Sequence, residues 1–134
     1  MIVGASFAGL EVARRLWDYL DVTIIDRQDF FEYICTSARG IVKEDHIDTI
    51  TTTYHQLVYE ASMDQLKFVQ GILKQVNRDR TIEIENLITG QPQIIEFDYL
   101  VLATGAIYGN PIRNKQNIYL ADRLDFVKDY QRKL

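Results

Sequence analysis

Three small residues near the start of the chain have a spacing that suits the binding of a dinucleotide pyrophosphate. Gly4, Ser6 and Gly9 form a G-x-S-x-x-G pattern between a short apolar run and a helical pattern. In a strand-turn-helix of this kind, the first glycine allows the tight turn. The second lets the backbone approach the pyrophosphate, and the third lets helix and strand pack closely. The helix N-terminus then offers N–H groups and a positive dipole end to the phosphates.

Ser6 is the departure from this pattern, because it stands where the second glycine is expected. Its side chain is small and its backbone N–H is still available, so we expect weakened binding of a pyrophosphate rather than none. Its hydroxyl either pushes the phosphate outward or donates a hydrogen bond to it. Taken alone, the pattern is equally compatible with a tight β-to-α turn that binds no ligand.

Asp26 supplies a second element of the same chemistry. It ends the run DVTIID, seventeen residues after Gly9. A carboxylate about 20 residues after the glycines accepts hydrogen bonds from ribose hydroxyls in dinucleotide-binding folds. A negative charge there also disfavours a 2′-phosphate by repulsion. The alternative is a polar residue at a strand end, but together the two elements favour an adenine dinucleotide.

The elements around these residues predict a parallel βαβ unit over about residues 1–27. Met1–Val3 is a short apolar strand, residues 9–19 carry apolar side chains at helical spacing, and Asp21–Asp26 is rich in β-branched residues. Two apolar strands that flank a helix are typical of a parallel sheet. The fold class that we expect is α/β, with a Rossmann-like parallel sheet.

An antiparallel β-meander is predicted as an insert over about residues 66–98. Short alternating runs are separated by turn residues at 77–80 and 89–91. The runs are Lys67–Val69, Ile72–Val76, Thr81–Glu85 and Gln93–Phe97.

The rest of the chain holds one further apolar strand and shorter helical stretches. Residues 98–105, DYLVLATG, predict a continuous apolar strand that ends in small residues. A last helix is expected over about 120–134, and one or two helical turns over 54–61. Residues 30–42 predict a loop that leads into a short helix, and 46–53 show no clear pattern.

Composition and charge narrow the classes of protein further. The chain has 134 residues, 47% hydrophobic and 25% charged, with a net charge of −4. This net negative charge does not predict binding to nucleic acid. No stretch of the sequence approaches the roughly 18 consecutive apolar residues of a membrane helix. Cys35 is the one cysteine, so no internal disulfide forms. We expect its side chain to be a half-buried apolar group. A single thiol fits a reducing compartment, and we expect an intracellular one, cytoplasmic or mitochondrial. No metal-binding motif is found.

The order of the motifs resembles the FAD-binding half of the pyridine-nucleotide flavin oxidoreductases. The stretches that carry the resemblance are IVGASFAG, VTIIDRQDFFEY, SARGIV, FVQGILKQVN and FDYLVLATGAIYGNPIRN. Within that superfamily the chain is most similar to the apoptosis-inducing-factor-like, ferroptosis-suppressor type, which is related to the type II NADH dehydrogenases. The resemblance covers essentially the whole chain.

The resemblance implies a set of FAD contacts. Asp26 would hold the adenosine ribose, and Arg39 would reach the phosphates or the flavin side, unless it is a solvated helix residue. Leu73 would offer its backbone to the adenine. The pyrophosphate would be wrapped by the turn residues Gly4, Ala5, Ser6, Phe7, Ala8 and Gly9. The middle of the cofactor would lie near Ala103, Thr104 and Gly105.

The resemblance also implies a redox activity that this chain would not complete alone. Hydride would pass from NAD(P)H to flavin, and electrons then to a quinone or similar acceptor; one cysteine excludes dithiol chemistry within the chain. We expect a truncated domain without the NAD(P)H-binding unit or the later Gly-Asp flavin segment. Sheet edges left open would make the chain aggregation-prone or dependent on a covering protein partner. Two alternatives are a non-catalytic nucleotide-binding or interaction relic, and a structural subunit that has lost its ligand.

Overall fold

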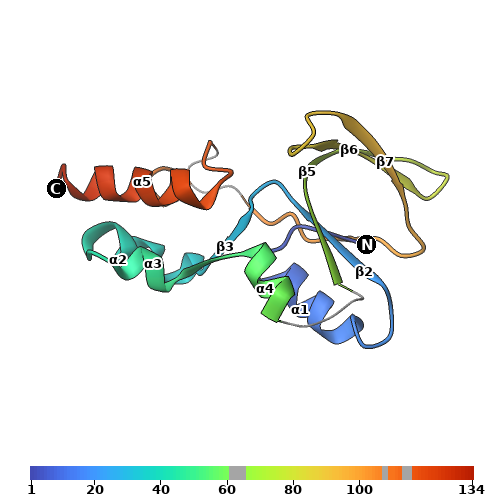
Figure 1. The fold of residues 1–134 in the computed structure, drawn as a ribbon, viewed down its shortest axis with the longest axis horizontal. Coiled ribbons are helices and arrows are strands. Elements are labelled where there is room, and N and C mark those ends of the chain that lie inside the picture. The colour runs from blue at the N-terminus through green and yellow to red at the C-terminus, as the bar shows by residue number, and fades with distance from the viewer. Residues whose placement is uncertain (61–65, 107–108, 113–115) are drawn as a thin grey trace. The chain divides into compact units, whose positions relative to one another are not determined.

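The computed structural model describes residues 1–60, 66–106, 109–112 and 116–134. These residues form two units. Unit 1 consists of Met1–Arg27 and Val58–Gly105, and unit 2 of Gln28–Leu57 and Ala106–Leu134. Figure 1 shows the elements of both units.

Unit 1 is built on a six-stranded sheet with the order β7-β6-β5-β2-β1-β8. The strands β5, β2, β1 and β8 run parallel, and β5, β6 and β7 form an antiparallel meander. This arrangement confirms the predicted α/β class. The strand bounds are β1 Ile2–Val3, β2 Val22–Asp26, β5 Leu66–Val76, β6 Thr81–Asn86, β7 Pro92–Glu96 and β8 Val101–Leu102.

The helix α1, Phe7–Leu16, packs against β1 and β2 and completes the predicted βαβ unit. It begins two residues earlier than the apolar spacing predicts, because Ser6 has extended backbone and acts as the N-cap. It also ends earlier than predicted, in a turn at Leu16 whose carbonyl accepts the amides of Tyr19 and Leu20. Ala13 is fully buried and anchors the helix to the sheet.

The strand β5 corrects the prediction of two separate runs. Leu66–Val76 is one strand of 11 residues, interrupted only by a register shift between Leu73 and Gln75. Its first half pairs in parallel with β2, so that part belongs to the Rossmann-like sheet and not to the meander. Gly71 lets the strand continue through the junction, because a Cβ there would lie 3.0 Å from the Cδ1 atom of Ile84.

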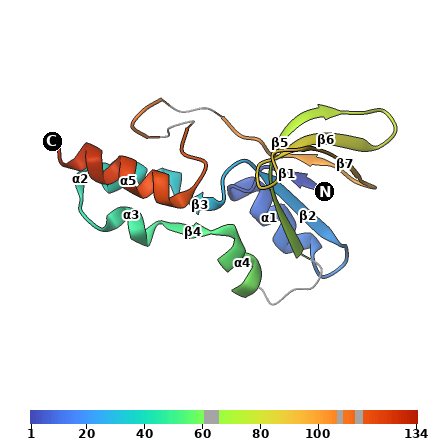
Figure 2. The same cartoon turned by 45° about the horizontal axis from the view of Figure 1, so that its top comes forward.

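The meander packs its apolar side on the parallel strands. Val3 and Ile25 form one buried cluster with Ile82 and Ile84 of β6. Figure 2 shows β5 bending so that β6 and β7 curl away from the plane of β1 and β2. The core of unit 1 therefore lies between two parts of the same sheet, with α1 against the other face of β1 and β2 (Figures 1 and 2).

The strand β8 is much shorter than the predicted run over 98–105. The strand itself is Val101–Leu102, in register with β1, which is also two residues long. Among the described strands, β7 and β8 form the two edges of the sheet. Leu102 is 58% exposed, so this edge presents an apolar side chain to solvent.

Unit 2 contains a two-stranded antiparallel sheet and short helices. The sequence pattern predicts neither β3 nor β4, because each has three residues and no alternation of buried and exposed positions. The helical turns predicted over 54–61 are confirmed over Tyr54–Glu60 as α4, and Ala61 lies outside the described residues. The boundary between the two units falls within this helix. The bounds are β3 Phe30–Glu32, η1 Ile34–Thr36, α2 Ser37–Val42, α3 His46–Thr49, β4 Thr51–Thr53, α4 Tyr54–Glu60 and α5 Leu120–Gln131.

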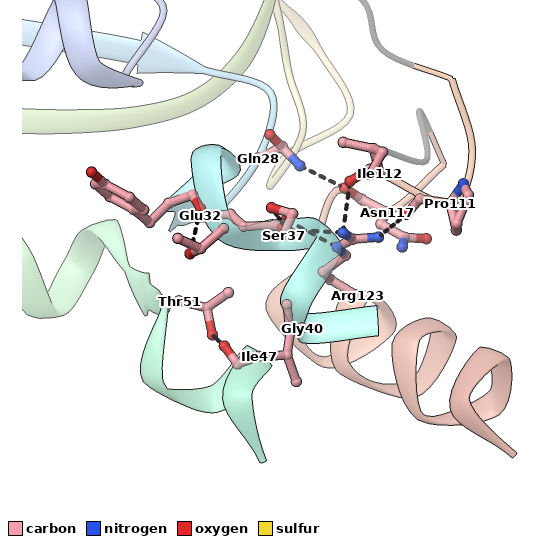
Figure 3. A network of polar contacts seen from close by, with 12 residues as sticks. Gln28, Glu32, Ser37, Gly40, Ile47, Thr51, Pro111, Ile112, Asn117 and Arg123 are labelled. Atoms are coloured by element: carbon pink, nitrogen blue, oxygen red, sulfur yellow. Dashed lines mark hydrogen bonds and ion pairs between the residues drawn. The ribbon is translucent and has the colours of Figure 1, made fainter. Parts of the chain in front are cut away.

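A buried ion pair joins α5 to β3 within unit 2 (Figure 3). Arg123 is 1% exposed, and its Nε and Nη2 atoms donate to Glu32 Oε2 and Oε1 at 2.9 and 2.8 Å. Nη1 and Nη2 also donate to the carbonyls of Pro111 and Ile112 at 3.2 and 2.7 Å. The Ser37 hydroxyl donates to Glu32 Oε1 at 2.7 Å. The charges are thus compensated away from water.

Asp29 holds the N-terminus of α5 from a distant part of the chain. Its Oδ1 atom accepts the amide of Leu120 at 2.8 Å, and its own amide donates to the carbonyl of Ile118. Its carbonyl accepts the amide of Tyr54. Burial raises the pKa of the Asp29 carboxyl above its ordinary value, and the Leu120 amide opposes that shift in part.

Cys35 corrects another expectation. It lies in η1 and is exposed rather than half-buried. Its neighbour Ser37 takes the fully buried position at the start of α2.

Among the helices of the described residues, none is long and apolar enough to cross a membrane.

Candidate functional site

The predicted site residues of unit 1 gather where parallel strands end. In the order β5-β2-β1-β8, the strand β1 has β2 on one side and β8 on the other, so the strand order reverses at β1. Ligands of open α/β sheets bind beyond the carboxyl ends of the strands at such a switch point. Gly4 follows β1 at this position, and Asp26 and Ala103 stand at the corresponding ends of β2 and β8.

Gly4 makes the tight turn that its position predicts. Its φ is +101°, a region that L side chains rarely adopt, and its amide donates to the carbonyl of Ile25 at 2.8 Å. A Cβ on Gly4 would lie 2.2 Å from the carbonyl oxygen of Ala103. The turn after β1 therefore presses directly against the end of β8.

Gly9 lies where α1 passes closest to the same turn. A Cβ on Gly9 would lie 1.8 Å from the carbonyl oxygen of Gly4 and 3.4 Å from the Cγ2 atom of Ile2. No side chain fits there without moving the backbone. The close helix-to-strand approach is the role that the spacing assigns to this glycine.

Ser6 fits its position without backbone strain. Its φ of −84° and ψ of −161° are extended values that any L residue adopts. Its side chain makes no capping hydrogen bond to α1, and the residue is partly buried. The next two residues, Phe7 and Ala8, begin the helix and are exposed, Phe7 to 41%. The serine is thus compatible with a formed turn, and its hydroxyl is not committed to the helix cap.

Asp26 is bonded to the glycine-rich turn itself. Its Oδ2 atom accepts the amide of Ala5 at 2.7 Å. Ala5 is fully buried and Asp26 is partly buried. The sequence predicts a carboxylate near a ribose, and the structure adds that this carboxylate contacts the turn predicted to hold the phosphates.

The small residues after β8 complete this edge. The amide of Ala103 donates to the carbonyl of Val3 at 2.7 Å, which extends the pairing of β8 with β1. Thr104 and Gly105 are exposed, and Gly105 has a φ of +67° with open space beside it. Small residues therefore follow β8 at this edge of the sheet.

Two further predicted site residues, Leu73 and Arg39, belong to other elements than this turn. Leu73 lies in the half of β5 that pairs with β6, opposite Ile84, and its side chain packs against the core of the meander. Arg39 lies in unit 2, exposed on α2. Their roles toward a cofactor stay predictions.

Gln70 is a residue of this region that the sequence analysis did not single out. It is 4% exposed and stands opposite Asp26 in the β2–β5 register. Its Nε2 atom donates to the carbonyl of Arg27 at 3.2 Å, and its carbonyl accepts the amide of Leu87. The signal in the sequence that could have revealed it is a polar residue directly before Gly71 in an otherwise apolar run.

The turn, the strand-end carboxylate and the sheet order together define a Rossmann-like fold of the FAD/NAD(P)-binding type. The chain belongs to the pyridine nucleotide-disulphide oxidoreductase family, whose model matches residues 1–133. This match confirms the superfamily that the sequence motifs indicate.

The similar proteins agree with this assignment. Apoptosis-inducing factor homolog B of Dictyostelium discoideum is 29% identical over 106 residues, which cover 79% of this chain and 24% of that protein. Homolog A of the same organism is 28% identical over 106 residues, 79% of this chain and 23% of that protein. The solved structure of NDH2 from Plasmodium falciparum in complex with NADH has a TM-score of 0.74 at 18% identity. The matched residues cover 98% of this chain and 27% of the NDH2 chain.

The lengths differ greatly between this chain and these proteins. The chain spans about a quarter of the curated relatives that it matches, 24% and 23%. The likeness to NDH2 supports the fold, and the likeness to the two homologs supports the apoptosis-inducing-factor-like relation.

Proposed function

We propose that this chain is the FAD-binding portion of an NAD(P)H-dependent flavoprotein oxidoreductase. The observation that carries the proposal is the contact of the Gly4 turn with Ala103 at the switch point of the sheet, beside Asp26. The family match over residues 1–133 supports a pyridine-nucleotide and flavin context for that turn.

The residues of unit 1 fit the adenosine diphosphate half of FAD. Gly4 and Gly9 leave no room for side chains against the carbonyls of Ala103 and Gly4, which fixes the turn next to the start of α1. The small Ser6 stands at the position where the backbone would approach a pyrophosphate. The N-terminus of α1 supplies N–H donors to the phosphate oxygens. Asp26 would accept ribose hydroxyls, and its charge would oppose a 2′-phosphate.

The chemistry of the whole protein is proposed by analogy with its family. A bound flavin supplies the capacity to accept a hydride from NAD(P)H and to pass electrons to a quinone or similar acceptor. The role of this chain would be to hold and orient the cofactor. The 134 residues contain one glycine-rich turn of this type, so we propose that they do not complete the catalytic cycle alone. Exposure of the single thiol Cys35 is compatible with a reducing, intracellular compartment.

Calorimetric titration of the chain with FAD, ADP and FMN tests this proposal. We expect FAD and ADP to bind and to compete, and FMN, which lacks the adenosine half, not to bind. Gly4→Ala should abolish binding, whereas the control Gly109→Ala should not, because no atom of the described residues lies within 4 Å of a Cβ on Gly109. Absence of FAD and ADP binding, or binding unaffected by Gly4→Ala, would contradict it.

An interaction role is the second candidate, favoured by the edge strand β8. Leu102 is 58% exposed there, on a strand with a partner on one side only among the described strands. The unpaired N–H and C=O groups of a sheet edge can pair with another chain. We propose that a protein partner covers it, and sedimentation velocity of wild type and Leu102→Lys tests this. Self-association of the wild type that the lysine variant loses supports the proposal. A wild-type chain that is monomeric in sedimentation and unfolds cooperatively in thermal melts contradicts it.

A further inference from the structure

We propose that Asp26 is a positioning residue for the phosphate-binding turn, in addition to any contact with ribose. Its carboxylate would fix the turn before a ligand arrives and would couple the ribose end of the site to the pyrophosphate end. This inference rests on the proposed dinucleotide function, because it concerns the same site.

The first support is the bond between Asp26 and Ala5. The Ala5 residue is fully buried, so its amide needs an acceptor inside the protein. Asp26 Oδ2 provides one at 2.7 Å. A hydrogen bond to an ionised carboxylate is shorter and stronger than one between neutral groups. Ala5 lies between Gly4 and Ser6, at the centre of the turn.

The second support is that β2 holds two consecutive amides of this turn. The amide of Gly4 donates to the carbonyl of Ile25, and the amide of Ala5 donates to the side chain of Asp26. Asp26 itself is held in the sheet, in register with Gln70 of β5. Each of the last two residues of β2 therefore accepts one amide of the turn.

A carboxylate can serve both partners at once, because its two oxygens offer about four lone-pair sites. Ribose hydroxyls could therefore bind Asp26 while Ala5 remains bonded. The positioning role and a simple charge role then predict opposite signs for a ligand without ribose. Removal of a negative charge alone would strengthen the binding of pyrophosphate, whereas loss of the turn's acceptor would weaken it.

The test uses the whole chain with Asp26→Ala and Asp26→Asn. Asp21→Ala is the matched control, since Asp21 is exposed and precedes the opposite end of β2. The probes are inorganic pyrophosphate, ADP and FAD, measured by calorimetry or by NMR titration. The second readout is hydrogen exchange of the Ala5 amide in the ligand-free protein.

We expect Asp26→Ala to bind pyrophosphate about tenfold more weakly, as for the loss of a charged hydrogen bond. Asp26→Asn should bind pyrophosphate within about threefold of wild type, because its carboxamide oxygen still accepts the Ala5 amide. The Ala5 amide should exchange faster in Asp26→Asn than in wild type, because the neutral bond is weaker. Asp21→Ala should change none of these values.

Several results would overturn the inference. If a folded Asp26→Ala variant binds pyrophosphate as well as wild type or better while wild type binds FAD, Asp26 acts through charge or ribose alone. If Asp26→Ala does not fold, the Asp26→Asn variant decides. An Ala5 amide that exchanges at the wild-type rate in Asp26→Asn would also show that Asp26 does not position the turn. If wild type binds none of the three probes, the proposed function itself fails, and the positioning role fails with it.

Discussion

The carbonyl oxygen of Gly4 occupies the space where a Cβ of Gly9 would stand, 1.8 Å away. These two residues therefore fix the distance between the turn after β1 and the first turn of α1. Any side chain at position 9 must push the helix away from the strand, and this displacement would also open the predicted pyrophosphate site.

Gly9→Ala is expected to destabilise the fold by about 3 kcal/mol or more, as overpacking against rigid backbone does. Urea unfolding followed by circular dichroism measures this change. Gly40→Ala is the control, because a Cβ there meets nothing nearer than 3.5 Å and lies within α2. That variant should be neutral or stabilising by about 0.5–1 kcal/mol. A Gly9→Ala protein with the wild-type midpoint would contradict the close packing.

Ser6→Ala should cost less than an ordinary N-cap replacement. Loss of a capping serine usually costs about 1 kcal/mol, but the Ser6 side chain makes no capping bond. We therefore expect a loss of stability below about 0.5 kcal/mol. Thermal melting of the two proteins measures it, and a loss near the ordinary value would show that the hydroxyl does cap α1.

The buried pair Arg123–Glu32 predicts a strong effect for single substitutions and a weaker one for the pair. Arg123→Met leaves Glu32 charged and buried, which costs about 3–5 kcal/mol. Adding Glu32→Gln to that variant should recover part of the loss, because no uncompensated charge remains. Denaturant unfolding of wild type, both single variants and the double variant gives the coupling. Additive effects of the two substitutions would contradict this account.

Asp29 predicts a dependence of stability on pH in the acid range. Its pKa is raised in the folded state, mainly by burial, so the folded protein binds a proton more readily than the unfolded chain. The resulting stability is present below the ordinary value of 3.8 and is lost as the pH rises through the folded pKa. Asp29→Asn keeps an oxygen acceptor for Leu120 and removes the charge. The variant should therefore be at least as stable as wild type at neutral pH, and its stability should depend less on pH above 3.8. Thermal melting across the acid range measures this dependence. A variant that is less stable than wild type at pH 7 would contradict the account.

Much of unit 1 could be predicted from local patterns in the sequence. The βαβ unit follows from two apolar runs around a helical pattern, and Gly4, Gly9 and Asp26 follow from their spacing along it. The bond between Ala5 and Asp26 could not be predicted, because it depends on where β2 ends in three dimensions.

Unit 2 shows why the rest was not predicted. Its strands β3 and β4 have three residues each, which is too short for a period of two to emerge. Arg123 and Glu32 are 91 positions apart, and neither type of residue is expected in a core. The exposure of Cys35 depends on the same packing of α2, which places Ser37 inside.

Titration of the purified chain with FAD, followed by thermal melting and by the visible absorption spectrum, tests the central claim most directly. A ligand that binds the native state must raise the melting temperature. The account predicts a yellow protein, or a saturable rise with FAD that NADP does not reproduce. A colourless protein whose melting temperature does not change at any FAD concentration would contradict it, and the glycine-rich turn would then serve the fold alone.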